Sequence, residues 1–438
     1  MLLRVYSGLR GACVSSVIRP PRSGRRRKMP RASNPTTIDP ALDAAALLRR
    51  IGFFGLFVIL PVLAQVARRA TVILAPIAVV LLIIASAIDR RQRPVRPAVT
   101  RLLTAPAFLA GMLVVLWSVL SLTWTPFLGP AVERLANLAA TIGLALLGYF
   151  ALPDRMRSAN LYLLPLGVVA GSIVAIVLGL FGAHLAPPGI DDDGALDRGL
   201  ILLILLVWPA LAWLRSRRRD REALGLALLV ALALTVQPDV TQIAALAVGT
   251  LAFAVTSYRP KLGVMLTATI SAALLAVAPL LPFLARPIGA ALLGPLSPAV
   301  LSLKSWQKVV TTDPVRLITG HGFETALRGR LVGLLPVNAP TTALFEFWYE
   351  LGIVGALAAA FALYASIRRG GRDIPALIPG AMGCFAAAFT VACLGVGLTA
   401  IWWLSIIAIA VVVFVAVERG QFRTSRPKVA KLHRLREE

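Results

Sequence analysis

Long apolar stretches alternate with short polar stretches from residue 51 to residue 417. A helix that crosses about 30 Å of hydrocarbon needs roughly 20 mostly apolar residues. Twelve stretches approach that length, so the pattern predicts about twelve transmembrane helices and an all-α polytopic membrane protein. Their ranges are 51–67, 70–88, 103–122, 135–152, 160–182, 199–214, 223–237, 241–257, 262–284, 342–366, 374–394 and 398–417.

The basic residues follow the same alternation. Cytoplasmic loops of membrane proteins carry an excess of Lys and Arg. If the N-terminus is cytoplasmic, the inside segments hold 35 of the 45 Lys and Arg residues, and the acidic stretch 189–197 falls outside. An odd number of helices would destroy this arrangement, so we expect both termini in the cytoplasm. The inside segments are 1–50, 89–101, 153–157, 215–222, 258–261, 367–373 and 418–438.

The chain divides into three parts by composition. Residues 1–50 are Arg-rich and contain no apolar core long enough for a signal peptide, so we expect a disordered cytoplasmic tail, with Met29 as an alternative start. Residues 51–420 form the predicted transmembrane domain, which contains one large outer loop, 285–341. Residues 421–438 form a second basic tail.

The overall composition excludes several classes of function. The chain is 58% hydrophobic and 15% charged, with a mean hydropathy of +0.81, which a soluble domain could not sustain. The net charge of +25 lies in clusters between apolar stretches, which marks topology and argues against a nucleic-acid surface. Three Cys and three His are too few and too scattered for a metal enzyme, and no nucleotide motif is present, so we expect no cofactor.

The large loop is basic on the side where positive charge is normally avoided. Its stretch LSLKSWQKVV (301–310) places Trp306 on one helical face and Lys304 and Lys308 on another. This spacing favours a short helix lying in the membrane interface. The two lysines either anchor that helix or meet an anionic headgroup.

Candidate chemistry lies in TGHGFETALRGR (319–330) and in the helix that follows it. His321 and Glu324 are titratable, and the flanking glycines allow close backbone approach to a ligand. The alternative is an ordinary turn that enters a helix. Glu346 and Glu350 lie four residues apart at the outer end of the tenth span, where a carboxylate is costly unless it is paired or lines a wet cavity. Glu350 either serves a function or neutralises Arg328 or Arg330.

The run WYELGIVGAL (348–357) resembles a signature of the O-antigen ligase and O-antigen polymerase superfamily. Three other stretches resemble the same family in the same order: WSVLSLTWTPFLGPAVERLANL (117–138), DRGLILLILLVWPALAWL (197–214), and SLKSWQKVV followed by PVRLITGHGFE (302–324). The similarity covers roughly residues 50–420. Members are bacterial inner-membrane proteins that act on polyprenyl-diphosphate-linked glycans.

The resemblance implies a metal-independent glycosyltransferase of envelope polysaccharide or lipopolysaccharide biosynthesis. It would transfer a glycan, by ligation or polymerisation, from a polyprenyl-diphosphate donor to a lipid or glycan acceptor at the periplasmic face. Such a reaction needs cations on the leaving diphosphate and a base for the acceptor hydroxyl. The candidates are Arg198, Arg328 and Arg330 for the diphosphate, Lys304 as a secondary cation, and His321 or Glu324 as the base.

The chain departs from the family pattern in two places. The family His ahead of the Trp-x-Glu-Leu-Gly run is replaced by Thr341, or by Asn338 if the loop is shifted, and neither side chain can act as a base. The family Arg ahead of the loop Trp is also missing, with Ser302 near its place. Two alternatives therefore remain: a transporter or flippase for a lipid-linked or anionic solute, and a non-catalytic assembly partner.

Overall fold

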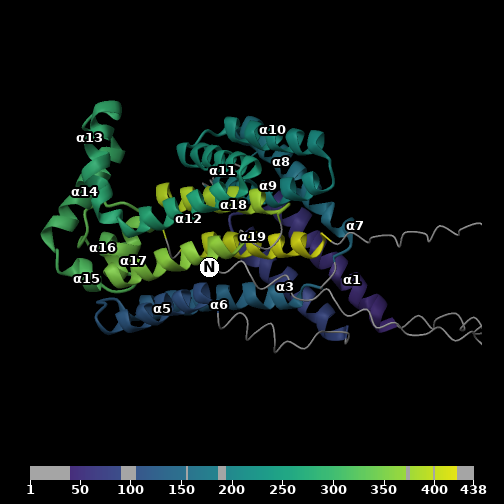
Figure 1. Ribbon diagram of the computed structural model, residues 1–438, viewed down its shortest axis with the longest axis horizontal. Coiled ribbons are helices and arrows are strands. Elements are labelled where there is room, and N and C mark those ends of the chain that lie inside the picture. The colour runs from purple at the N-terminus through teal and green to yellow at the C-terminus, as the bar shows by residue number, and fades with distance from the viewer. Residues whose placement is uncertain are drawn as a thin grey trace, which may run out of the picture. The chain divides into compact units, whose positions relative to one another are not determined.

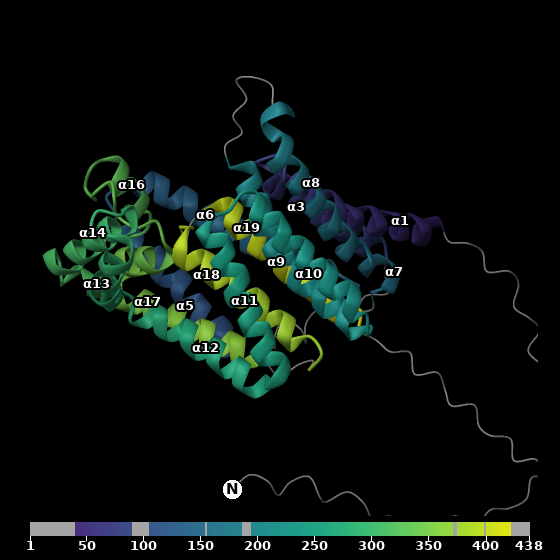
Figure 2. The same cartoon turned by 90° about the horizontal axis from the view of Figure 1, so that it is seen from above.

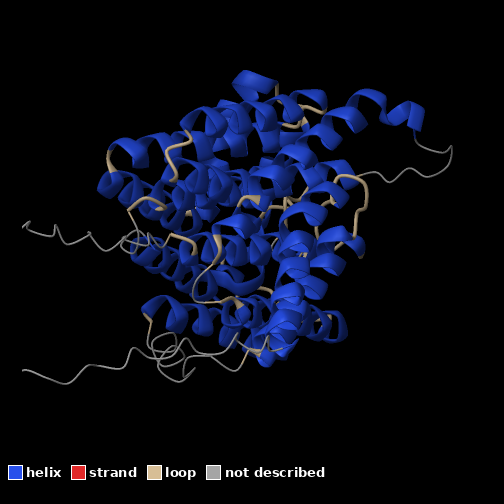
Figure 3. Cartoon of the chain, turned by 90° about the vertical axis from the view of Figure 1, so that its right-hand side faces the viewer, coloured by secondary structure: helices blue, strands red, loops and turns tan. Residues whose placement is uncertain are grey.

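The computed structural model describes residues 40–89, 105–153, 156–185, 194–370, 375–397 and 400–421. Every regular element in these ranges is a helix (Figures 1 and 3). The tails at 1–39 and 422–438 lie outside the described residues, as does most of the acidic stretch. The α-helices are α1 (Pro40–Phe54), α2 (Leu60–Leu63), α3 (Ala70–Ile88), α5 (Pro106–Leu120), α6 (Leu128–Ala151), α7 (Ser158–Leu161), α8 (Leu163–Leu185), α9 (Ala195–Ser216), α10 (Asp220–Val236), α11 (Val240–Tyr258), α12 (Pro260–Ala276), α13 (Leu281–Leu293), α14 (Pro298–Thr312), α15 (Arg316–Thr319), α16 (Thr325–Leu331), α17 (Ala343–Gly370), α18 (Ile378–Leu394) and α19 (Ile401–Arg419).

Nine helical segments of the described chain are long and apolar enough to cross a membrane, and ten if the bent pair α12–α13 is one span. The described chain is therefore that of a multi-pass, all-helical membrane protein. The remaining two of the twelve expected spans correspond to α10 and α18, which have 17 residues each and fall below that length. The first turn of α10 also carries Asp220 and Glu222, which shorten its apolar part.

Three predicted boundaries are corrected by the structure. The first helix begins at Pro40 and not after residue 50, because Pro at the first helical position and the Ala- and Leu-rich sequence behind it both favour helix. The span expected at 262–284 breaks after Ala276, where α12 and α13 meet at 67° beside Pro279. The helix expected at 301–310 begins earlier and ends later, since α14 covers Pro298–Thr312, and α13, α15 and α16 occupy much of the rest of the large loop.

One end of the helix bundle gathers the arginine-rich turns that the sequence assigns to the cytoplasm. Met156 N donates to Arg419 O (3.0 Å), the Arg217 guanidinium donates to Gly420 O (3.1 Å), and that of Arg215 donates to Ser257 Oγ (3.1 Å). We call the end formed by 152–153, 156–157, 215–221, 257–261 and 419–421 the arginine-rich end. Four turns far apart in sequence thus meet there, as an alternating topology requires.

The opposite end, which we call the loop end, holds the α5–α6 turn, α14 to α16, and the first part of α17 (Figure 1). There α17 packs against both α5 and α12 (Figure 2). In the interior, α9 is buried along most of its length and packs against α8, α10, α18 and α19.

Candidate functional site

Helix α17 is interrupted at Gly352, where the backbone has φ 62° and ψ −162°. In an unbroken helix the carbonyls of Tyr349, Glu350 and Leu351 would each accept a hydrogen bond from the amide four residues later. Here all three accept from outside the helix. His321 N donates to Tyr349 O (2.8 Å), Gly322 N donates to Glu350 O (3.1 Å), and Trp117 Nε1 donates to Leu351 O (2.8 Å).

Glycines make this close approach possible. A Cβ atom on Gly320 would lie 2.1 Å from Glu350 O, and one on Gly352 would lie 2.4 Å from Ile318 O. Both residues also have positive φ, which L side chains rarely adopt. The glycines beside His321 therefore allow its backbone to approach α17 closely.

The α5–α6 turn holds the same loop from its other side. Ser121 Oγ accepts a hydrogen bond from Phe323 N (3.1 Å), and Thr125 Oγ1 donates to Phe323 O (2.9 Å). A Cβ on Gly322 would lie 2.8 Å from Thr125 Cα. The segment 320–324 is thereby fixed between α17 and the α5–α6 turn.

Glu324 is the centre of a buried ion cluster. Its side chain is fully buried, and its backbone is left-handed, with φ 66°, immediately before α16. Arg134 Nε, from α6, lies 3.3 Å from Glu324 Oε1, and Arg328 Nε lies 3.9 Å from the same atom. The side chains of Arg134 and Arg328 are 25% and 39% exposed, so both guanidiniums remain within reach of a ligand. A left-handed non-glycine residue in such a place is a strain that marks functional sites.

Two further carboxylates lie beside this cluster on α17. Arg330, whose side chain is 12% exposed, lies 3.5 Å from Glu346 Oε1 and donates from Nε to Ala326 O (3.2 Å). Glu350 Oε1 accepts from Ala326 N (3.1 Å), while Glu350 Oε2 is buried without a hydrogen-bond partner. Of the partners expected for Glu350, Arg330 thus pairs with Glu346 and Arg328 with Glu324.

His321, which lies between α15 and α16 in the chain, packs against α17. Its ring stacks on Tyr349, with centroids 4.0 Å apart and planes at 12°. Its Nδ1 lies 3.1 Å from Tyr349 O. Because a carbonyl oxygen can only accept, Nδ1 carries the proton of the neutral ring, and Nε2 keeps a lone pair. Burial lowers the pKa of His321 below 6.5, opposed by the backbone bond to Tyr349 and, more weakly, by Asp313, so the ring is neutral at pH 7.

Little space surrounds the buried edge of this ring. A crevice of about 10 Å³ lies between His321, Trp306, Phe345 and Asp313, which is room for about one water. A sugar would therefore have to approach the exposed edge of His321, whose side chain is 21% exposed.

The other candidates are Arg198 on α9, Lys304 on α14, and the two residues at the place of the family His. Arg198 stacks over the Trp402 ring at 4.9 Å, where α9 begins near the start of α19. Gly397, which precedes Trp402 of α19 by five residues, packs against Glu346, so Arg198 belongs to the loop end. Lys304 is exposed on α14, while Trp306 on its other face packs against Phe345 of α17. Asn338 and Thr341 are both exposed.

Arg134 is the site residue that sequence reasoning missed. It lies in one of the stretches that carry the family resemblance, and it is one of the few basic residues on the expected outer side. That second property was the available signal, because cations are normally avoided there.

Within the described residues, no group of three or more His, Cys, Asp or Glu side chains lies together as a metal site requires. Comparison of the chain with protein-family models, with curated proteins and with solved structures finds no match.

Proposed function

We propose that this protein transfers a glycan from a polyprenyl-diphosphate donor to an acceptor hydroxyl at the periplasmic face of a bacterial inner membrane. The proposal rests on the resemblance in sequence, and one structural observation supports it. The partly exposed guanidiniums of Arg134 and Arg328 both pair with the buried carboxylate of Glu324. Glu324 lies three residues after His321, whose ring is neutral.

The chemistry divides between these groups. The acceptor hydroxyl gives its proton to Nε2 of His321 while its oxygen attacks the anomeric carbon of the donor sugar. The bond from that carbon to the diphosphate oxygen breaks, and its electron pair stays on the leaving diphosphate. Arg134 and Arg328 neutralise the charge, because a guanidinium binds phosphate oxygens with a planar pair of donors. Arg330 is already engaged by Glu346 and Ala326, so it supports the site and does not bind substrate.

The proposed site needs a topology with the loop end in the periplasm. We extend the candidate spans to twelve by including α10 and α18, since 17 residues is the lower limit for a crossing helix. The arrangement of turns supports this count, because all four turns of the arginine-rich end come from segments assigned to the cytoplasm.

Purified protein in liposomes tests the reaction directly. Donor-dependent transfer should fall at least about tenfold in Arg328→Lys and Arg134→Lys, since charge is kept but the two-donor geometry is lost. The change Arg221→Lys, at an exposed position of the arginine-rich end, is the matched control and should leave transfer unchanged. Full transfer in both site variants would overturn the proposed diphosphate clamp.

His321 is tested separately. His321→Ala and His321→Gln should each lower transfer by about 10²–10⁴-fold at equal protein levels if the ring is the base. Full transfer in His321→Gln would make this residue structural, and Glu324 would then be tested next. Deletion of the gene should also shift the lipopolysaccharide or capsule ladder of the parent organism.

A non-catalytic assembly partner is the second candidate, and it is favoured by Thr341 and Asn338 at the place of the family His. Normal ladders that require the protein but survive the changes at Arg134, Arg328 and His321 would support this candidate. For a transporter, the broken helix would have to offer its free carbonyls to a solute. In this structure, the three carbonyls before Gly352 accept hydrogen bonds from His321, Gly322 and Trp117. Solute counterflow in liposomes would test transport.

A further inference from the structure

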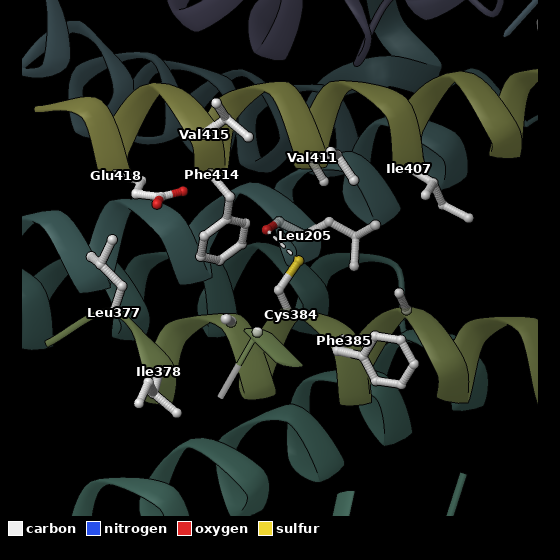
Figure 4. Close-up of a pocket in the computed structure, with 14 residues that line it drawn as sticks. Leu205, Leu377, Ile378, Cys384, Phe385, Ile407, Val411, Phe414, Val415 and Glu418 are labelled. Carbon is white, nitrogen blue, oxygen red and sulfur yellow. Dashed lines mark hydrogen bonds between the residues drawn. The ribbon is translucent and has the colours of Figure 1, made fainter. Parts of the chain in front are cut away.

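Helices α18 and α19 follow each other in the chain, yet a groove separates them. Both pack against α9, which forms the floor of the groove at Leu205. The volume of the groove is about 320 Å³. Figure 4 shows α19 residues from Ile407 to Glu418 along one wall and α18 residues from Leu377 to Phe385 along the other.

The wall of the groove is apolar over its whole length except at one end. Of its lining residues only Glu418 is charged, and it lies opposite Leu377 (Figure 4). The thiol of Cys384, halfway along, donates to Leu205 O at 3.5 Å, so its polar atom is already engaged. Along this apolar wall water would find no hydrogen-bond partners, whereas a hydrocarbon chain could enter without leaving any polar group unpaired.

The length of the groove matches one leaflet of a bilayer. From Ile407 to Glu418 the wall rises along eleven helical residues, or about 16 Å at 1.5 Å per residue. Half of a hydrocarbon core of about 30 Å is about 15 Å. The groove therefore runs from the helix ends to about the middle of the membrane and then stops.

The polar end of the groove coincides with the arginine-rich end of the bundle. Glu418 directly precedes Arg419, and Gly370, which also lines the groove, directly follows Arg368 and Arg369. An apolar chain of one leaflet's length fits the lining, and the arginines beside this end, not the carboxylate of Glu418, would face its phosphate. We propose that this groove binds one acyl chain of a membrane phospholipid, whose headgroup lies beside Arg368 and Arg369.

This lipid is distinct from the donor of the proposed reaction. The groove opens at the end opposite to the Glu324 cluster, so a polyprenyl diphosphate bound by Arg134 and Arg328 would place its headgroup at the other side of the membrane. The lipid would act as a packing element between α18 and α19, and the inference does not depend on glycan transfer.

Crosslinking tests the proposal on the unaltered protein. A phospholipid with a photoreactive group in the middle of its acyl chain is incorporated into liposomes with the protein, and crosslinked peptides are mapped by mass spectrometry. We expect crosslinks concentrated in 377–388 and 407–415. Crosslinks spread evenly over the exposed faces of the other membrane helices would overturn the proposal.

A filled groove gives the second test. Ala381→Phe combined with Ala388→Phe places two rings in the groove, while Ala140→Phe adds one ring on an exposed face of α6. After extensive detergent washing, wild type and Ala140→Phe should retain about one phospholipid per chain, and the double variant at least threefold less. Equal retention in monodisperse samples of all three proteins would also refute the acyl-chain site.

Discussion

The properties of single residues at the loop end depend on their contacts with α17. The carbonyl of Tyr349 accepts from both the backbone and the ring of His321. This double contact fixes the tautomer of the ring as well as its position. A residue with this geometry responds to pH in a way that an exposed histidine does not.

Protonation of His321 should destabilise the fold. Burial holds its pKa below 6.5, so the unfolded chain binds the proton more readily than the folded chain. Stability therefore falls as the pH drops through about 6.5. We expect the unfolding midpoint in detergent to decrease more for wild type than for His321→Gln between about pH 7.5 and about pH 5.5. A parallel decrease in both proteins would contradict a buried neutral ring.

The Arg330–Glu346 pair should behave as a buried ion pair. Arg330→Met leaves Glu346 buried without this guanidinium, which should cost on the order of 3 kcal/mol of unfolding free energy. Adding Glu346→Gln should recover most of that loss, because the uncompensated charge disappears. Arg221→Met, at an exposed position, is the control and should change stability by less than about 0.5 kcal/mol. Additive losses in the double variant would show that the two side chains are not coupled.

Among the elements, α17 is a membrane helix in two pieces. Residues before Gly352 are bonded to the loop, and residues after it pack along α12. The break is therefore an architectural junction between the outer site and the membrane-spanning bundle.

Gly352→Ala should damage this junction. Its φ of 62° with ψ of −162° belongs to a region that is essentially restricted to glycine, which costs about 1–3 kcal/mol for other residues before any clash with Ile318 O is counted. Gly225→Ala is the matched control, because Gly225 lies within α10 with open space around its Cα. That change should be neutral or slightly stabilising. Thermal unfolding of both variants in detergent would decide, and equal midpoints would contradict the strained geometry.

The helices themselves were predictable, and the break was not. Apolar runs located every membrane helix of the described chain, because the bilayer imposes length and composition locally. The run ELGIVG gives no sign of an interruption, since Gly occurs within regular membrane helices as well. The bonds that stabilise the break come from Trp117 and from the loop around His321, and such distant partners leave no periodic pattern.

The site was predictable only as a set of candidates. The sequence indicated Glu324 as a titratable residue beside the glycines, and Arg328 and Arg330 as cations for a diphosphate, but the partners of these residues depend on the fold. Arg134 pairs with Glu324 across 190 residues of chain. Arg330 forms its ion pair with Glu346 and not with Glu350. These choices depend on which helices meet, and a single sequence does not show that.

On the scale of the whole molecule, the two ends differ in charge and in content. The arginine-rich end joins four basic turns, whereas the loop end carries the buried carboxylates and most of the regular structure outside the bundle. This polarity predicts how the protein lies in its membrane.

Reporter fusions test that orientation. Fusions at Asp192 and Gly322 should report the periplasm, and fusions at Arg218 and Lys428 the cytoplasm, because Lys and Arg are retained inside. The fusion at Gly322 is decisive for function. A cytoplasmic signal there would place the proposed site on the side of the membrane opposite to the proposed reaction and would overturn it.

The bond from Trp117 to Leu351 also sets an order of events during synthesis. Its two partners are 234 residues apart, and the hydrogen-bonded residues Ser121 and Phe323 are 202 residues apart. A ribosome that adds about 5–20 residues per second needs about 10–50 s to cover such a distance. During that interval α5 and α6 are already in the bilayer with polar groups that have no final partner. The loop end therefore stays incomplete until α17 has been made, and a quality-control factor that inspects the newborn chain can reach its unpaired groups during that interval.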